Sequence, residues 1–93
     1  MLLISPQAEE DLLNIWSYIA SDSPVNADRF LSYLYEQAQH LVELPQSGKW
    51  RAELSPNVRS FPVAKYLLFY REQGSNIELI RVLHAARDID TLF

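Results

Sequence analysis

The stretch that decides the fold is residues 58–84, which read VRSFPVAKYLLFYREQGSNIELIRVLH. β-Branched and aromatic residues, which favour strands, dominate three runs in it, at 58–63, 65–71 and 76–83. Gly74 and its polar neighbours indicate a tight hairpin between the last two runs. Proline cannot donate to a strand ladder, so Pro62 suggests that the first strand ends or bulges there.

Upstream of these strands the hydrophobic spacing is helical. Ser5-Pro6 and Ser23-Pro24 are both helix starts, because serine caps free N–H groups and proline fits the first helical position. Apolar residues recur at helical spacing to about Ala20, and again until Pro45. The link between the helices is so short that it predicts an antiparallel helical hairpin.

A short apolar run at residues 2–4 precedes the hairpin, which completes the pattern β-α-α-β-β-β. Residues 49–54 alternate charged and apolar side chains, which also favours extended structure. We therefore expect an α+β fold over residues 1–93, a single domain with a helical hairpin on one face of a mostly antiparallel sheet.

Both faces of the central predicted strand are apolar. Tyr66 and Leu68 share one face, and Leu67 and Phe69 share the other. Two helices cannot cover both faces, so either the tail at 85–93 or another protein covers the second one. The tail is predicted as a short helix or an extended arm. The aromatic residues expected between helices and sheet are Trp16, Phe30, Tyr33 and Phe69.

Composition excludes several classes of function. The chain has 93 residues and no cysteine, which excludes disulfides, a thiol nucleophile and thiolate metal sites. Its two histidines, His40 and His84, are too few for a histidine-rich metal centre. We see no membrane-spanning run and no basic leader after Met1, so we expect a cytoplasmic protein without cofactors.

The charge is divided unevenly along the chain. Residues 1–48 hold seven acidic residues and one arginine, a net charge of −6, whereas residues 49–93 hold seven basic and five acidic residues, a net charge of +2. The total is −4. Binding to nucleic acid depends on neutralising phosphates, so this balance disfavours strong direct nucleic-acid binding.

No catalytic constellation stands out. The two glycines, Gly48 and Gly74, form no phosphate-binding loop, and Glu9-Glu10-Asp11 is explained by the dipole at a helix start. His84 is the one candidate acid or base near cations, and a hydrogen-bonded histidine at a strand end is the preferred explanation for it. Trp50, between two basic residues after a loop, is either core or a contact anchor.

Several segments resemble ParE-type toxins of the RelE/ParE superfamily. In the second half these are RSFPV at 59–63, YLLFYR at 66–71 and IRVLHAARDI at 80–89. The first half agrees through AEEDL at 8–12 and YIA at 18–20. The resemblance implies a toxin of a bacterial type II toxin–antitoxin pair, which inhibits DNA gyrase and is neutralised by a small ParD-like antitoxin that folds onto it.

The RelE branch of the superfamily instead cuts messenger RNA in the ribosome. At the positions that are similar to those of the catalytic arginines in these nucleases, this sequence has Leu67 and Ala85 instead. Neither side chain can stabilise a charged phosphate transition state, so we expect no catalytic residues. Arg81, His84 and Arg87 could together replace the missing catalytic residues, so a ribonuclease of the RelE type remains the alternative function. A third possibility is a non-toxic scaffold that serves only in transcriptional repression.

We expect the antitoxin to lie over the helical hairpin and the Leu67/Phe69 face. Arginine suits carboxylates of an acidic partner, which makes the strand arginines candidate anchors. The candidate residues for binding antitoxin or target are Trp50, Arg59, Leu67, Phe69, Arg71, Arg81, His84 and Arg87. The sequence leaves the oligomeric state open.

Overall fold

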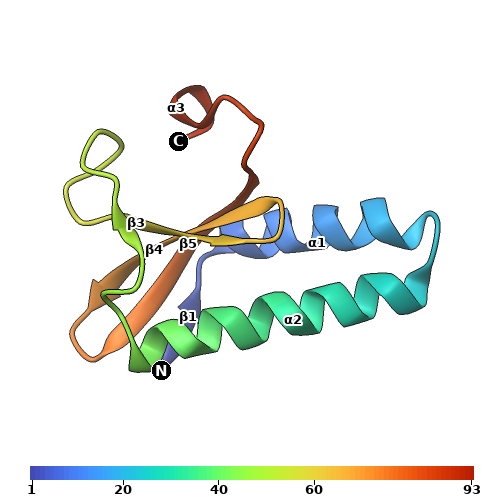
Figure 1. Cartoon of the computed structure of the whole chain (residues 1–93), viewed down its shortest axis with the longest axis horizontal. Helices are drawn as coiled ribbons and strands as arrows, with labels where there is room; N and C mark the ends of the chain where they lie inside the picture. The colour runs from blue at the N-terminus through green and yellow to red at the C-terminus, as the bar shows by residue number, and fades with distance from the viewer.

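The computed structural model describes residues 1–93, apart from the side chain at position 92. Its elements are β1 (Leu2–Ile4), α1 (Pro6–Ala20), α2 (Pro24–Glu43), β2 (Lys49–Trp50), β3 (Arg59–Val63), β4 (Tyr66–Gln73), β5 (Asn76–His84) and α3 (Ile89–Leu92). Figure 1 shows the long hairpin of α1 and α2 extending to one side of a twisted sheet.

The helical hairpin forms as its capping residues predict. The Ser5 hydroxyl accepts a hydrogen bond from the Ala8 N–H at 3.0 Å, and the Ser23 hydroxyl accepts one from the Asn26 N–H at 3.2 Å. In both helices proline follows the cap, where its missing N–H costs nothing. The predicted starts of both helices are therefore confirmed.

The sheet has five strands in the order β1-β5-β4-β3-β2. Strands β2 to β5 form an antiparallel meander, and β1 pairs in parallel with β5. The expected α+β architecture is confirmed, with one extra two-residue strand, β2. The alternation at 49–54 continues into a turn after Trp50, because Leu54 N–H bonds back to the Arg51 carbonyl.

The expected interruption at Pro62 is wrong. Strand β3 continues through this residue, which pairs with Leu67 of β4. Strand β2 pairs only with Arg59 and Ser60, so the other side of β3 is a free edge at Pro62 and needs no donor there. The register shift lies instead in the β4–β5 pair, between Phe69 and Tyr70.

The main core lies between the hairpin and one face of the sheet. It joins Leu12, Ile15, Leu34, Leu68 and Tyr70 with other buried residues of β3 and β5. Phe30 packs against this core as expected, and Tyr33 is about half exposed at 47%. Phe69 was expected here, but its side chain points to the opposite face of β4, because neighbouring residues of a strand alternate.

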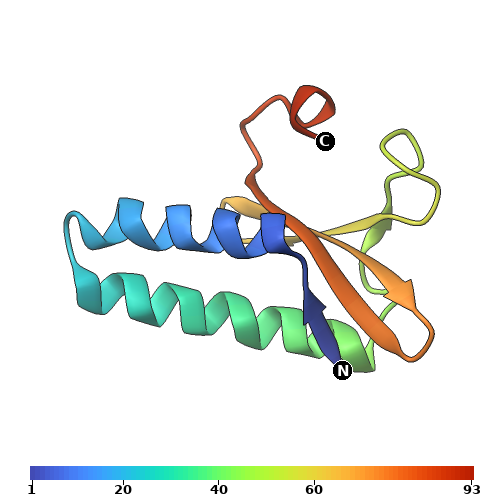
Figure 2. The ribbon, with the colours of Figure 1, turned by 180° about the vertical axis from the view of Figure 1, so that it is seen from behind.

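The second face of the sheet is covered by the C-terminal tail. Ile89 packs with Val58, Phe69 and Leu83 in a second cluster, and the Phe93 ring lies 5.1 Å from that of Phe69. Figures 1 and 2 show α3 folded back over the sheet on the side away from the helical hairpin. The tail, rather than a second protein, is therefore what covers this face.

Candidate functional site

The predicted site residues fall into three places. Trp50, Arg59 and Arg71 line one hollow with Asn57 and Glu72, hereafter the Trp50 hollow. His84 and Arg87 line a second hollow, hereafter the Tyr66 hollow, together with Asp11, Asn14, Ile15, Tyr18, Tyr66, Val82 and Leu83. Leu67 and Phe69 lie on the face covered by the tail, and Arg81 lies between α1 and β5.

The Trp50 hollow is built on a stacked pair. The guanidinium carbon of Arg59 lies 3.8 Å from the centroid of the Trp50 ring, and its Nη1 donates to the Gly48 carbonyl at 2.9 Å. The Arg59 Nε is buried and has no hydrogen-bond partner among the described residues. Trp50 is 52% exposed, so the pair presents a large aromatic surface held in place by a cation.

A close contact at Gly48 positions this pair. The Tyr70 hydroxyl accepts from the Gly48 N–H at 2.8 Å and donates to the Pro45 carbonyl at 2.9 Å. A Cβ on Gly48 would lie 2.5 Å from the Tyr70 oxygen, so only glycine fits there. Burial is the main cause that raises the pKa of Tyr70. The loop before β2 is thereby fixed to the core.

Sequence reasoning missed Arg51, the next residue after this strand. Its Nε bonds Glu53 at 2.8 Å, its Nη1 donates to the Ser60 hydroxyl at 3.2 Å, and its guanidinium lies over the Phe69 ring at 5.5 Å. The hydrogen bond from Arg51 is the main cause that lowers the pKa of Glu53. Arg51 thus closes one side of the tail-covered cluster.

Arg71 and Arg81, two further predicted site residues, each form an ion pair with a carboxylate, and the Arg71 side chain is the more exposed of the two. Arg71 bonds Glu78 across the strands at 2.7 Å and is 43% exposed. Arg81 makes a two-pronged contact with Asp11, at 2.8 Å and 3.0 Å, and this contact raises the pKa of Arg81. The same carboxylate accepts the Val82 N–H at 2.9 Å, at an edge of β5 that β1 does not reach. Arg81 therefore joins α1 to the sheet.

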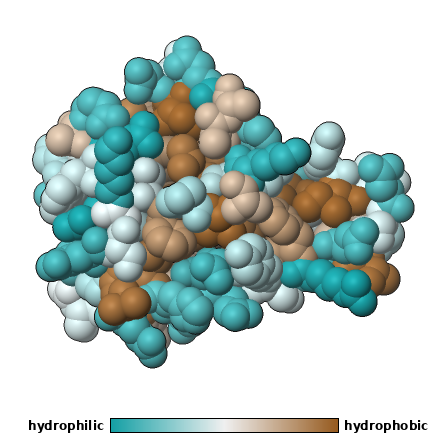
Figure 3. Space-filling view, in the orientation of Figure 1, coloured by the Kyte–Doolittle hydropathy of each residue, from teal (hydrophilic) through white to brown (hydrophobic). Residues whose placement is uncertain are grey.

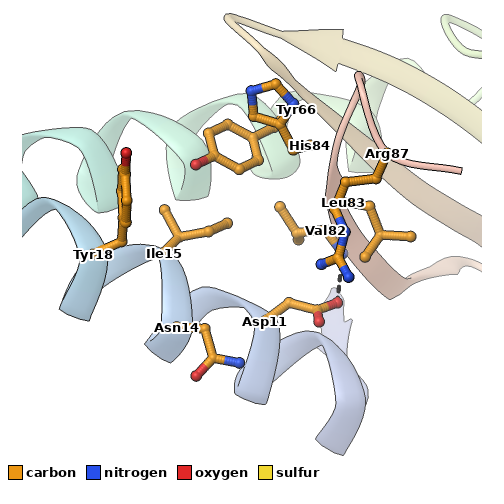
Figure 4. Close-up of a pocket in the computed structure, with 9 residues that line it drawn as sticks. All are labelled: Asp11, Asn14, Ile15, Tyr18, Tyr66, Val82, Leu83, His84 and Arg87. Atoms are coloured by element: carbon orange, nitrogen blue, oxygen red, sulfur yellow. Dashed lines mark hydrogen bonds between the residues drawn. The ribbon is translucent and has the colours of Figure 1, made fainter. Parts of the chain in front are cut away.

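The Tyr66 hollow joins residues far apart in the chain (Figure 4). It is a space of about 180 Å³ between α1, the start of β4 and the end of β5. The rings of Tyr66 and His84 meet edge to face at 5.4 Å, and Phe30 lies behind Tyr66 at 5.6 Å. Desolvation by burial raises the pKa of Tyr66. Tyr18 and Tyr66 were not predicted as site residues, since only the tertiary structure brings α1 beside β4.

The two positions where RelE-type nucleases carry arginines contribute no cation. The Leu67 side chain packs in the second cluster, and Ala85 is an exposed residue whose N–H bonds the Lys65 carbonyl. Among the described residues, no group of three or more acidic or histidine side chains could hold a metal ion. No described helix is long and apolar enough to cross a bilayer.

The hairpin carries a shallow apolar groove on its outer side. It is lined by Glu9, Leu12, Leu13, Trp16, Leu31 and Tyr35. Leu13 is 63% exposed and Tyr35 is 43% exposed. Figure 3 shows hydrophobic side chains among hydrophilic ones over the hairpin end of the molecule.

Comparison with known proteins agrees with this architecture. The family model described as the ParE toxin of the type II toxin–antitoxin system parDE matches residues 2–89. A solved structure described as the chromosomal ParDE TA system from P. aeruginosa is similar at 23% identity, with a TM-score of 0.75 over 89% of this chain and 92% of that chain. A search of curated proteins gives no significant match. The chain belongs to the ParE toxin family of type II toxin–antitoxin systems.

Proposed function

We propose that this toxin inhibits DNA gyrase by protein–protein contact, without catalysis, and that a cognate antitoxin neutralises it. The family supplies the expectation of gyrase as the target. The observation that carries the contact mechanism is the Trp50–Arg59 pair, a half-exposed aromatic ring backed by a guanidinium at 3.8 Å. Tryptophan and arginine are the residues that most often dominate binding energy at interfaces.

We propose that the antitoxin binds in the apolar groove on the outer side of the helical hairpin. An amphipathic helix can place its apolar side against Leu13, Trp16 and Tyr35, and folding on binding buries apolar area on both chains. The Leu67/Phe69 face, the other part of the expected antitoxin site, lies under the tail. An antitoxin segment can contact the Leu67/Phe69 face only if residues 89–93 move away from the sheet.

An in vitro supercoiling assay with purified gyrase tests the target. We expect inhibition by the toxin, at least about tenfold weaker for Trp50→Ala, because a hot-spot aromatic contributes about 2 kcal/mol or more. Tyr33→Ala removes an aromatic residue of similar exposure on α2 and is the matched control. No inhibition at high molar excess would remove gyrase as the target and leave the family assignment standing.

Expression without antitoxin separates the three possibilities. Gyrase inhibition predicts filamentation and DNA-damage signalling, whereas a RelE-type ribonuclease predicts rapid translational arrest with cut messages. The ribonuclease has one observation in its favour, since His84 and Arg87 share a hollow with Tyr66. Its proposed third member, Arg81, is bonded to Asp11 instead. Harmless expression would indicate the repression-only scaffold.

A further inference from the structure

The apolar groove on the outer side of the hairpin is long enough to hold a helix. Its apolar lining comes from both helices and consists of Leu12, Leu13, Trp16, Leu31 and Tyr35. A second hollow shares Tyr35 with it and extends it along α2 to β1, with the lining Leu2, Tyr35, Glu36, Gln39 and His40. Helix α1 has 15 residues and is therefore about 22 Å long. A partner helix of about four turns can lie along this hairpin groove.

Carboxylates border the hairpin groove on both helices. Glu9 lines it from α1, and Glu36 lines its extension from α2. Asp28 lies on the same face of α2 as Tyr35, because the two residues are seven positions apart. The Asp28 Oδ1 accepts the Trp16 indole N–H at 2.8 Å, which places this carboxylate beside the aromatic part of the lining.

These border carboxylates have no cationic partner among the described residues. Within the hairpin only Asp11 forms an ion pair, and its partner Arg81 lies on the sheet. The indole N–H that bonds Asp28 is neutral and leaves the carboxylate charge uncompensated. Residues 1–48 contain one arginine, Arg29, against seven acidic residues. The hairpin groove is therefore apolar inside and negative at its borders.

We propose that the hairpin groove binds a helix of the antitoxin whose apolar stripe is bordered by lysine or arginine. Apolar side chains at positions i, i+3 and i+7 of this helix lie against the lining, and the flanking cations pair with Glu9, Asp28 and Glu36. The apolar stems of these long cationic side chains cover the exposed parts of Leu13 and Tyr35. This deepens the proposed function, which supplies the antitoxin as the partner.

The negative borders disfavour other occupants of the hairpin groove. Anionic lipid or nucleic acid would place phosphates against these carboxylates. A second copy that packs hairpin against hairpin would bring the same excess of acidic residues. An acidic segment of the antitoxin meets the same repulsion here, and the arginines predicted to bind such a segment do not line the groove.

Titration of designed helical peptides into the isotope-labelled full chain, followed by NMR, tests the proposal. The probe has two repeats of Leu-Lys-Gln-Leu-Ala-Ala-Lys between an acetyl and an amide cap. Its matched control has Glu in place of every Lys, which keeps the apolar stripe and a similar helix propensity. At about 50 mM salt we expect a Kd of about 10–500 µM for the lysine peptide and at least about tenfold weaker binding of the glutamate peptide.

Salt and the two tryptophans show whether the binding is of the proposed kind. About 0.5 M salt should reduce the difference between the peptides to less than about threefold, because it screens exposed charges. The indole N–H signal of Trp16, in the hairpin groove, should shift with the lysine peptide. The indole signal of Trp50, on the sheet, should stay unchanged.

Charge variants of the toxin locate the effect. Glu9→Gln combined with Asp28→Asn removes two border carboxylates and keeps an acceptor for the Trp16 indole, and should weaken binding of the lysine peptide by about fivefold. Glu72→Gln combined with Asp90→Asn removes the same net charge from exposed positions of β4 and α3, and should change the affinity by less than about twofold. Circular dichroism checks that each variant is folded.

Each contrary result has a distinct meaning. Equal binding of the two peptides with the Trp16 shift retained, or equal effects of the two double variants, would overturn the cationic border and leave the antitoxin groove of the proposed function standing. No binding of either peptide at about 2 mM would overturn both. A Trp16 signal that changes on dilution of the chain alone would assign the groove to a second copy and overturn the proposal. None of these measurements contains gyrase, so the gyrase assay stays independent of them.

Discussion

At the scale of single residues, the contact between Asp11 and Arg81 links segments 70 positions apart. The two side chains are 12% and 20% exposed, and the carboxylate also satisfies a strand-edge N–H. A partly buried pair of this kind is costly to break from one side, because the remaining charge keeps its desolvation penalty.

Asp11→Asn is therefore expected to lower the free energy of unfolding by about 2–3 kcal/mol, measured by urea denaturation. The control is Glu78→Gln at the Arg71 pair, which is more exposed and should cost less than about 1 kcal/mol. Equal losses in the two variants would show that the Asp11 contact does not hold the helix to the sheet.

Tyrosine burial predicts a loss of stability in alkali. The folded-state pKa values of Tyr66 and Tyr70 are raised above the ordinary value of 10.0, so the unfolded chain releases these protons first. Their contribution is fully present below pH 10 and is lost as pH rises through the folded-state values. Thermal unfolding against pH should show the decline, which Tyr66→Phe should reduce and Tyr35→Phe, at an exposed position, should not.

At the scale of elements, the two helix starts look alike in sequence but not in the fold. Both serines cap their helices, but the Ser5 hydroxyl also donates to the Ile80 carbonyl at 2.7 Å. This second bond lies at the part of β5 that β1 leaves unpaired. Ser5 therefore joins α1 to the sheet, whereas Ser23 serves only its own helix.

Ser5→Ala is expected to cost about 2 kcal/mol and Ser23→Ala about 1 kcal/mol in the free energy of unfolding, because only the first leaves a carbonyl without its donor. Chemical denaturation of both variants measures the difference. Equal costs, or a larger cost at Ser23, would contradict a sheet-joining role for Ser5.

At the scale of the whole molecule, the tail completes the domain. Ile89 is 8% exposed and covers Phe69 and Leu83, which are 0% and 2% exposed. Without this cover one face of the sheet would present a continuous apolar surface. The tail is thus part of the folding unit as well as a neighbour of the Tyr66 hollow.

Ile89→Asp should lower the free energy of unfolding by about 2–3 kcal/mol and increase binding of a hydrophobic dye, because it places a charge against the second cluster. Asp90→Ala, at an exposed neighbouring position, is the control and should do neither. Unchanged stability and dye binding in Ile89→Asp would mean that the tail does not seal the sheet.

The sequence by itself determined the elements, because caps, prolines and hydrophobic periods act within a few residues. Ser5-Pro6, Ser23-Pro24 and the strand residues around Leu68 predicted the hairpin and the sheet correctly. The same local signals failed at Pro62, where the absence of a neighbouring strand decides whether proline is tolerated.

Only the tertiary structure decided which side chains meet. The register shift in the β4–β5 pair leaves one extra residue in β5 between Leu79 and Arg81, so Leu79 and Val82 both face the hairpin although they are three residues apart. It also decided that Arg81 meets Asp11, and that the rings of Tyr66 and His84 pack edge to face. These pairings depend on how distant segments cross in space, and no short-range pattern in the chain records that.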